Sequence, residues 1–87
     1  MTQQQVLDHV RQFVTDHYLY RHPDVTLTDD LNLLESGIID SLGVIELVGE
    51  VEALFSVPVN DIDVTEENFG SVTGVVRFVE RQLAAAA

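Results

Sequence analysis

The spacing of apolar residues restricts the fold of this chain more than any other feature of its sequence. In three stretches, apolar or aromatic side chains recur at intervals of three and four residues, which places them on one face of an α-helix. The first stripe is Val6, Val10, Phe13, Val14 and His17, the second is Val44, Leu47, Val48, Val51 and Phe55, and the third is Val72, Val75, Val76, Val79 and Leu83. No strand-like alternation persists between them. The sequence therefore predicts three amphipathic helices whose stripes meet in one core.

Residues with known capping preferences predict where the first two helices begin and end. Thr2 and Gln5 fit a capping box at the start of the first helix. That helix must end before Pro23, because proline cannot continue it. The second helix is expected from about Ser41 to Phe55.

The last part of the chain contains one further short helix. Thr65 is suited to cap a helical turn through Phe69, Gly70 breaks that turn, and Ser71 is suited to cap the final helix. We therefore expect an all-α fold, a small antiparallel bundle of three main helices plus one short helix.

The chain has 87 residues, so we expect one small domain spanning residues 1–87. We expect order over about residues 2–83 and a frayed alanine tail at 84–87. Because the sequence starts at Met1 with no flanking linker, we expect a stand-alone protein. No signal peptide is visible, and no run approaches the roughly 20 apolar residues of a membrane span. These features predict a cytoplasmic, monomeric protein.

The connection between the first two helices, residues 21–40, is long for a compact domain, and such loops are often functional. Five apolar side chains are available to pin it to the core: Leu31, Leu33, Leu34, Ile38 and Ile39. Gly37 is the natural turn position within it.

The charge of the chain is strongly negative and unevenly distributed. Fifteen acids and four arginines give a formal net charge of −11, and no lysine or arginine lies between Arg21 and Arg77. Such a field attracts basic partner surfaces and speeds encounter with them. It repels phosphates, so we expect no nucleic-acid partner.

The segment Asp40-Ser41-Leu42 stands at the expected start of the second helix. Asp and Ser are both good helix caps, so Ser41 could be a plain cap. Alternatively, its hydroxyl could carry a phosphate, because a helix N-terminus has unpaired N–H groups and favours anions. At 100° per residue, a second face of this helix lies away from the buried stripe and combines acidic with apolar residues. Its residues are Leu42, Ile45, Glu46, Gly49, Glu52 and Ala53. This face is a candidate docking surface.

We expect neither a catalytic residue nor a metal site in the chain itself. A serine nucleophile needs a base and oxyanion donors, and no Gly-x-Ser-x-Gly elbow surrounds Ser41. His9, His17 and His22 show no metal-ligand spacing. The chain has no cysteine, so any thiol chemistry must come from an added group.

With these features, the sequence resembles the acyl carrier protein family. The matching residues form the pattern Asp-Ser-Leu-x-x-x-Glu-Leu over 40–47, preceded by "DDLNLLESGI" at 29–38. The resemblance covers nearly the whole chain in length, acidity and helix order. It implies that Ser41 is esterified by a 4′-phosphopantetheine arm from coenzyme A, added by a phosphopantetheinyl transferase with magnesium. The thiol of the arm would then hold acyl or aminoacyl groups as thioesters.

The resemblance also assigns roles to the neighbours of Ser41. Asp40 would support the loading step. Leu42, Glu46, Gly49 and Glu52 match the recognition helix that docks on basic partner surfaces, and the exposed face adds Ile45. The implied partners are the transferase, an acyl- or aminoacyl-loading enzyme, and synthase or tailoring enzymes with basic docking surfaces.

The residues before the serine depart from the usual family pattern. This chain has Gly-Ile-Ile-Asp-Ser-Leu, one residue longer than the Gly-x-Asp-Ser-Leu of fatty-acid carriers. In this it resembles carriers of polyketide and nonribosomal peptide biosynthesis, including those of unusual extender units, and also D-alanyl carriers. Gly49 stands where fatty-acid carriers often have a bulky residue. An aminoacyl, peptidyl or D-alanyl carrier therefore stays open as an alternative. So do a helical interaction module without the arm and a hydrolase using Ser41.

Overall fold

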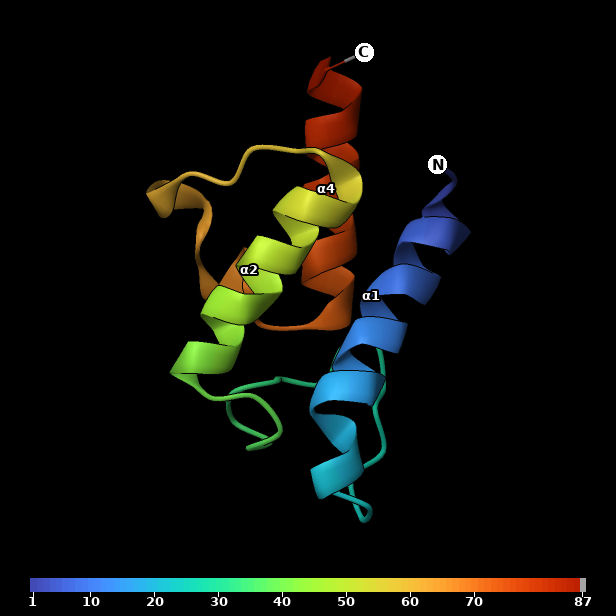
Figure 1. The fold of residues 1–87 in the computed structure, drawn as a ribbon, viewed down its shortest axis with the longest axis vertical. Helices are drawn as coiled ribbons and strands as arrows, with labels where there is room; N and C mark the ends of the chain where they lie inside the picture. The colour runs from blue at the N-terminus through green and yellow to red at the C-terminus, as the bar shows by residue number, and fades with distance from the viewer. Residues whose placement is uncertain (87) are drawn as a thin grey trace.

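Figure 1 shows the computed structural model of the chain, which describes residues 1–86. Over these residues the long helices are α1 (Gln3–His17), α2 (Ser41–Phe55) and α4 (Val72–Ala86), and α3 (Glu66–Phe69) is a single short turn. Two 3₁₀ helices, η1 (Leu19–Arg21) and η2 (Asp61–Asp63), lie in the connections. The predicted all-α fold with three main helices and one short helix is confirmed.

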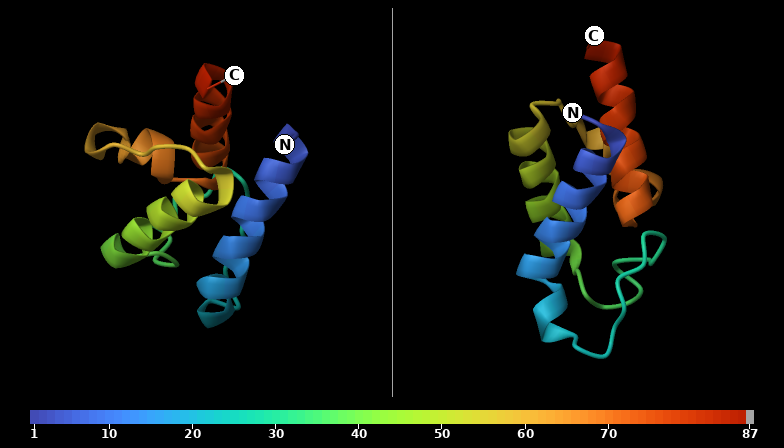
Figure 2. Two further views of the ribbon diagram at one scale, coloured as in Figure 1. Left: turned by 45° about the horizontal axis from the view of Figure 1, so that its top comes forward. Right: turned by 90° about the vertical axis from the view of Figure 1, so that its right-hand side faces the viewer.

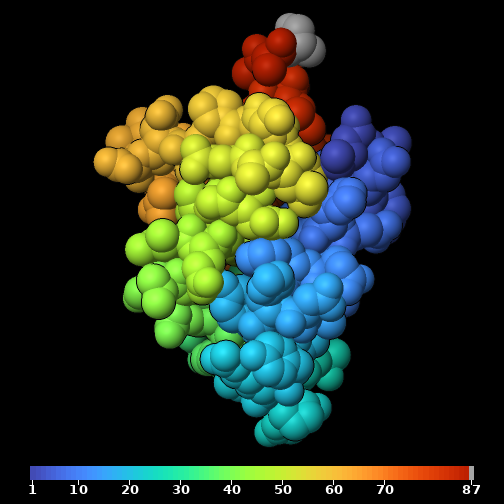
Figure 3. Space-filling view, in the orientation of Figure 1, coloured from blue at the N-terminus to red at the C-terminus, as the bar shows by residue number. Residues whose placement is uncertain are grey.

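The long helices form a bundle in which α1 runs opposite to the other two. In Figures 1 and 2, α1 descends from the N-terminus while α2 and α4 both ascend. The bundle is therefore antiparallel between α1 and each of its neighbours. The connection through η2 and α3 brings the chain back before α4 begins, and its segment at η2 projects to one side in Figure 3.

Three predicted capping residues begin their helices as expected. The Thr2 hydroxyl accepts from the Gln5 backbone N–H at 3.2 Å, and the Gln5 side chain accepts from the Thr2 N–H at 2.7 Å, which completes the capping box. Thr65 accepts from the Asn68 N–H at 3.2 Å, and Ser71 accepts from the Gly74 N–H at 3.1 Å. Each side chain pairs a donor that a helix start leaves free.

The core is built from the predicted stripes and contains no buried polar or charged side chain among the described residues. The stripe of α2 is narrower than predicted, because Leu47, Val51 and Phe55 are buried whereas Val44 and Val48 are only half-buried. In α1, His17 is exposed and its ring lies 4.4 Å from that of Phe13, centroid to centroid. The buried residues are Val6, Val10, Val14, Leu27, Leu33, Ile38, Ile39, Leu47, Val51, Phe55, Val57, Phe69, Val72, Val75, Val76, Phe78 and Val79.

The long connection before α2 is fixed by buried side chains and by backbone hydrogen bonds. Leu33, Ile38 and Ile39 are buried as predicted, and Leu31 packs against the core. The Leu33 N–H donates to the carbonyl of Gly70 at 2.8 Å. The prediction for Leu34 was wrong, because Leu34 is 45% exposed.

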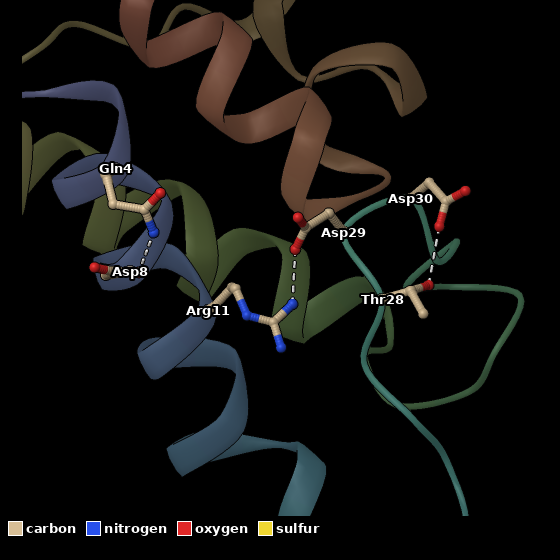
Figure 4. A network of polar contacts seen from close by, with 6 residues as sticks. All are labelled: Gln4, Asp8, Arg11, Thr28, Asp29 and Asp30. Carbon is tan, nitrogen blue, oxygen red and sulfur yellow. Dashed lines mark hydrogen bonds and ion pairs between the residues drawn. The ribbon is translucent and has the colours of Figure 1, made fainter.

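One residue of the loop joins α1 to α4, and Figure 4 shows its contact with α1. The Asp29 carboxylate accepts from Arg11 of α1 at 2.7 Å, and the Asp29 carbonyl accepts from the Thr73 N–H of α4 at 2.8 Å. Both ion-pair partners are more than a third exposed, so the pair itself adds little stability. Its effect is to fix the path of the loop that leads to α2.

The turn before α2 contains Gly37 with φ of 81°, which confirms the predicted turn position. This left-handed region is open to glycine at little cost. At the other end of the chain, helical geometry continues past Leu83 to Ala86. Fraying of residues 84–87 is a question of dynamics and stays a prediction, and Ala87 lies outside the described residues.

Candidate functional site

The start of α2 places Asp40 and Ser41 in different roles. Asp40 is the cap, with extended backbone and a carboxylate that accepts from the Gly43 N–H at 2.8 Å. Ser41 is the first helical residue, and its side chain is exposed. The interpretation of Ser41 as a plain cap is therefore wrong, because Asp40 caps the helix. The Ser41 hydroxyl takes part in no hydrogen bond with residues 1–86 and is open to reaction.

Two clefts lie on either side of this helix start. The first, here called the apolar cleft, has a volume of about 340 Å³ and is lined by Leu34, Ser41, Val44, Val64, Thr65 and Phe69 among others. The second, here called the charged cleft, has a volume of about 450 Å³ and is lined by Asp16, His17, Tyr18, Arg21, Asp40, Leu42 and Glu46 among others. The helix start is thus a ridge from which Ser41 faces one cleft while Asp40 and Leu42 face the other.

The wall of the charged cleft is closed by a contact between the end of α1 and α2. The Tyr18 hydroxyl donates to the Glu46 carboxylate at 2.9 Å and lies 3.4 Å from the Gly43 carbonyl oxygen. Burial raises the pKa of the Tyr18 phenol to about 12, with further contributions from the hydrogen bond to Glu46 and the negative charges of Glu46 and Asp40. The phenol therefore remains a donor at neutral pH.

The structure brings the predicted docking residues to one exposed face of α2. Leu42 and Ile45 are each 66% exposed, and Glu46, Gly49 and Glu52 are exposed as well. A Cβ atom added at Gly49 would meet no atom within 4 Å, so this position is flat and open. The Glu52 carboxylate accepts from the Val59 N–H at a long 3.4 Å. Whether this face docks partners stays a prediction.

Sequence reasoning missed several residues around the helix start. Ile62 in η2 is 85% exposed, and Leu34 and Val64 line the apolar cleft. The sequence held one signal for Ile62, an isolated apolar residue between Asp61 and Asp63. No comparable signal pointed to Tyr18, which belongs to a different helix from its partner Glu46.

Two other classes of site, metal centres and membrane spans, are not found in residues 1–86. No group of three or more His, Asp or Glu side chains in this part of the chain is arranged to hold a metal ion. None of its helices is long and apolar enough to cross a membrane.

Comparison with known proteins links this geometry to a family. A family model described as the phosphopantetheine attachment site matches residues 18–79, which include Ser41. D-alanyl carrier proteins of Streptococcus pyogenes, from serotype M5 (strain Manfredo), serotype M49 (strain NZ131) and serotype M1, are each 35% identical over 57 residues, covering 66% of this chain and 72% of the relative.

These matches define the class of the protein. Members of the family carry 4′-phosphopantetheine covalently and act as shuttles for other enzymes instead of catalysing a reaction themselves. A transferase that adds the arm and enzymes that load or process the carried group are the general partners of such proteins. Since the family model covers most of its length and the relatives are themselves carriers, this chain belongs to the family of acyl and peptidyl carrier proteins.

Proposed function

We propose that Ser41 is the attachment point of 4′-phosphopantetheine and that the chain presents acyl thioesters to partner enzymes. These enzymes belong to polyketide or mixed polyketide and peptide biosynthesis, including the formation of unusual extender units. The exposed hydroxyl of Ser41 at the first position of α2, beside a neighbour that already caps the helix, is the observation that supports this assignment best.

The residues around Ser41 fit a phosphodiester. A helix N-terminus attracts an anion at an exposed site by roughly 0.3–1 kcal/mol. Asp40 already places one negative charge there and uses the Gly43 N–H, so the additional gain for a phosphate is at the lower end of that range. The site therefore accommodates the phosphate without holding it tightly. An arm that moves between partner enzymes requires such weak binding.

Loading would convert the Ser41 hydroxyl into a phosphodiester. The serine oxygen forms a bond to the pantetheine phosphorus of coenzyme A, the pyrophosphate bond breaks, and the adenosine bisphosphate portion leaves. The hydroxyl proton passes to a base of the transferase. Asp40, adjacent and exposed, would support engagement of the transferase and its magnesium. When bound, the arm supplies the thiol that this cysteine-free chain lacks.

The apolar cleft supports an acyl cargo. It opens beside Ser41, and its walls include Leu34, Val44, Val64 and Phe69. A volume of about 340 Å³ is near the lower end of ligand pockets, and each CH₂ group removed from water gains about 0.8 kcal/mol. A short aliphatic chain would gain from this cleft more than a small amino acid would.

A second candidate is an aminoacyl carrier, and specifically a D-alanyl carrier. The similar proteins of Streptococcus pyogenes carry that name. Mass spectrometry of the protein purified from its native cell distinguishes the two, because a thioester-bound amino acid and an acyl chain differ in mass and in amine reactivity. Recovery of a D-alanyl thioester would exclude the polyketide assignment.

The exposed face of α2 would dock the partner enzymes. It combines the apolar side chains Leu42 and Ile45 with Glu46 and Glu52, and Gly49 leaves room for close approach. Partners with basic surfaces fit the negative charge of the chain. We further propose that the protein works as a cytoplasmic monomer, since its partners use coenzyme A.

Incubation with coenzyme A, magnesium and a broad-specificity phosphopantetheinyl transferase, followed by intact mass measurement, tests the assignment. The wild type should gain the mass of one phosphopantetheine and Ser41→Ala should gain none. Ser56→Gly is the matched control, because Ser56 is an exposed serine at the opposite end of the same helix and should leave loading unchanged. Equal labelling of Ser41→Ala and the wild type would reject Ser41 as the attachment site.

A further inference from the structure

The hydrogen bond between Tyr18 and Glu46 joins two parts of the chain that are far apart in sequence. Tyr18 is the C-cap residue of α1, and its own N–H donates to the Val14 carbonyl at 3.0 Å. Its hydroxyl reaches across to α2 and donates to the Glu46 carboxylate at 2.9 Å. Figure 3 shows the two helices side by side on this face of the molecule.

The position of the Tyr18 ring is fixed by its surroundings. Its ring meets that of Phe13 edge-on, with the centroids 6.0 Å apart. The ring also lies close to Gly43, where an added Cβ would come within 2.8 Å of the Ile39 side chain and 3.3 Å of the Tyr18 ring. Glycine at this position therefore allows the ring to approach the first turn of α2. The hydroxyl is held within reach of residue 46.

This contact restrains the Glu46 carboxylate without neutralising it. Within residues 1–86 the ion pair that forms is Arg11–Asp29, so no arginine of this part of the chain is paired with the Glu46 carboxylate. A carboxylate has about four acceptor sites and the phenol occupies one, which leaves the others free because Glu46 is exposed. A side chain that is already ordered loses less entropy when a partner binds.

We propose that Tyr18 is a positioning residue for partner docking, whose hydroxyl holds Glu46 at the wall of the charged cleft as a charged acceptor for a basic side chain of the partner. The inference rests on the proposed function, because it assigns Tyr18 a part in the docking of carrier partners. It extends the docking surface from α2 to the end of α1.

A double-mutant cycle tests this role. The rate of loading with coenzyme A, magnesium and a phosphopantetheinyl transferase is measured as kcat and KM for the wild type, Tyr18→Phe, Glu46→Gln and the double variant. Phenylalanine keeps the ring packing and removes only the hydroxyl. Tyr20→Phe is the matched control, because Tyr20 lines the same cleft but its hydroxyl accepts from Arg21 and makes no hydrogen bond to Ser41–Phe55.

Tyr18→Phe should raise KM about two- to fivefold at low salt, with kcat little changed, because binding must then order the Glu46 side chain that Tyr18 held. In the Glu46→Gln background the same change should have little further effect, because the carboxamide can still accept from Tyr18 but carries no charge to attract a basic side chain. Tyr20→Phe should behave as the wild type. An equal effect of Tyr18→Phe in both backgrounds would mean that Tyr18 acts through the fold and not through Glu46. An unchanged KM in Tyr18→Phe would also overturn the proposal.

A second measurement does not depend on loading or on the folding of Tyr18→Phe. Ultraviolet absorbance titration in the Tyr20→Phe background, where Tyr18 is the one tyrosine left, follows the Tyr18 phenol with and without Glu46→Gln, an exposed substitution. The phenol should titrate at lower pH in Glu46→Gln, and identical titrations would show that no such hydrogen bond forms. If the wild type gains no mass in the loading assay, the proposed function fails and this inference falls with it. If the wild type is loaded and the effects of Tyr18→Phe and Glu46→Gln on KM are additive, only this inference fails.

Discussion

Replacing Asp40 separates its capping of α2 from the effect of its charge. The Asp40 carboxylate accepts from the Gly43 N–H at 2.8 Å, and its carbonyl accepts the first helical hydrogen bond from the Val44 N–H at 3.0 Å. Asp40→Ala removes only the first of these. Asp40→Asn keeps an oxygen acceptor at the same place and removes the charge, so the two variants differ in the cap alone.

The structure sets the size of each effect. Loss of an N-cap costs about 1 kcal/mol, within a range of roughly 0.5–2. Loss of the charge at a helix N-terminus costs about 0.3–1 kcal/mol, but Glu46 lies in the same cleft and the chain carries a net charge of −11. Relief of that repulsion offsets much of the charge effect. We expect Asp40→Ala to lose about 1 kcal/mol and Asp40→Asn to remain close to the wild type.

Urea unfolding followed by far-ultraviolet circular dichroism measures both variants. For a domain of this size, 1 kcal/mol corresponds to a shift of roughly 4–8 °C in the melting temperature, which gives a second readout. Two results would refute the reasoning. Equal destabilisation by Asp40→Ala and Asp40→Asn would mean that Asp40 stabilises the fold through its charge and not through its cap. A neutral Asp40→Ala would mean that Ser41 can take over the cap, and Ser41 would then be less free to carry a group.

Three further expectations concern charge, backbone strain and pH. Added salt should raise the melting temperature, because it screens the self-repulsion of a chain with net charge −11, and melts that do not change between low and moderate salt would contradict this. Ser56 ends α2 with φ of 54°, a conformation that costs a non-glycine residue roughly 1–2 kcal/mol. Ser56→Gly should therefore stabilise the fold by about 0.5–1 kcal/mol after the entropy cost of glycine. A lower free energy of unfolding in urea would contradict this. The raised pKa of Tyr18, about 12 instead of 10, stabilises the fold fully below pH 10, and this stability is lost as the pH rises from 10 through 12. The wild type should therefore lose stability across that interval more steeply than Tyr18→Phe, and parallel pH profiles would count against it.

The sequence alone was sufficient to predict the helices and the exposed face of α2. Helical periodicity is a local property, so the stripes that begin at Val6, Val44 and Val72 placed the three helices correctly. Thr2 and Thr65 were also recognisable as caps, since capping depends on residues three positions apart. The pattern Asp-Ser-Leu-x-x-x-Glu-Leu indicates the family for the same reason, because all of its residues lie in one short continuous segment.

Only the tertiary structure decided which residues outside the helices are buried and which of two good caps is used. Leu27 and Val57 are buried while Leu34 is exposed, although nothing in their local sequence distinguishes them. Asp40 rather than Ser41 caps α2, and the chain enters that helix directly after the buried side chain of Ile39. The hydrogen bond from Tyr18 to Glu46 and the two clefts likewise arise where separate helices meet. Periodicity fixes the face that a residue occupies on its own helix, whereas burial in a loop depends on contacts between distant segments, which a local pattern does not encode.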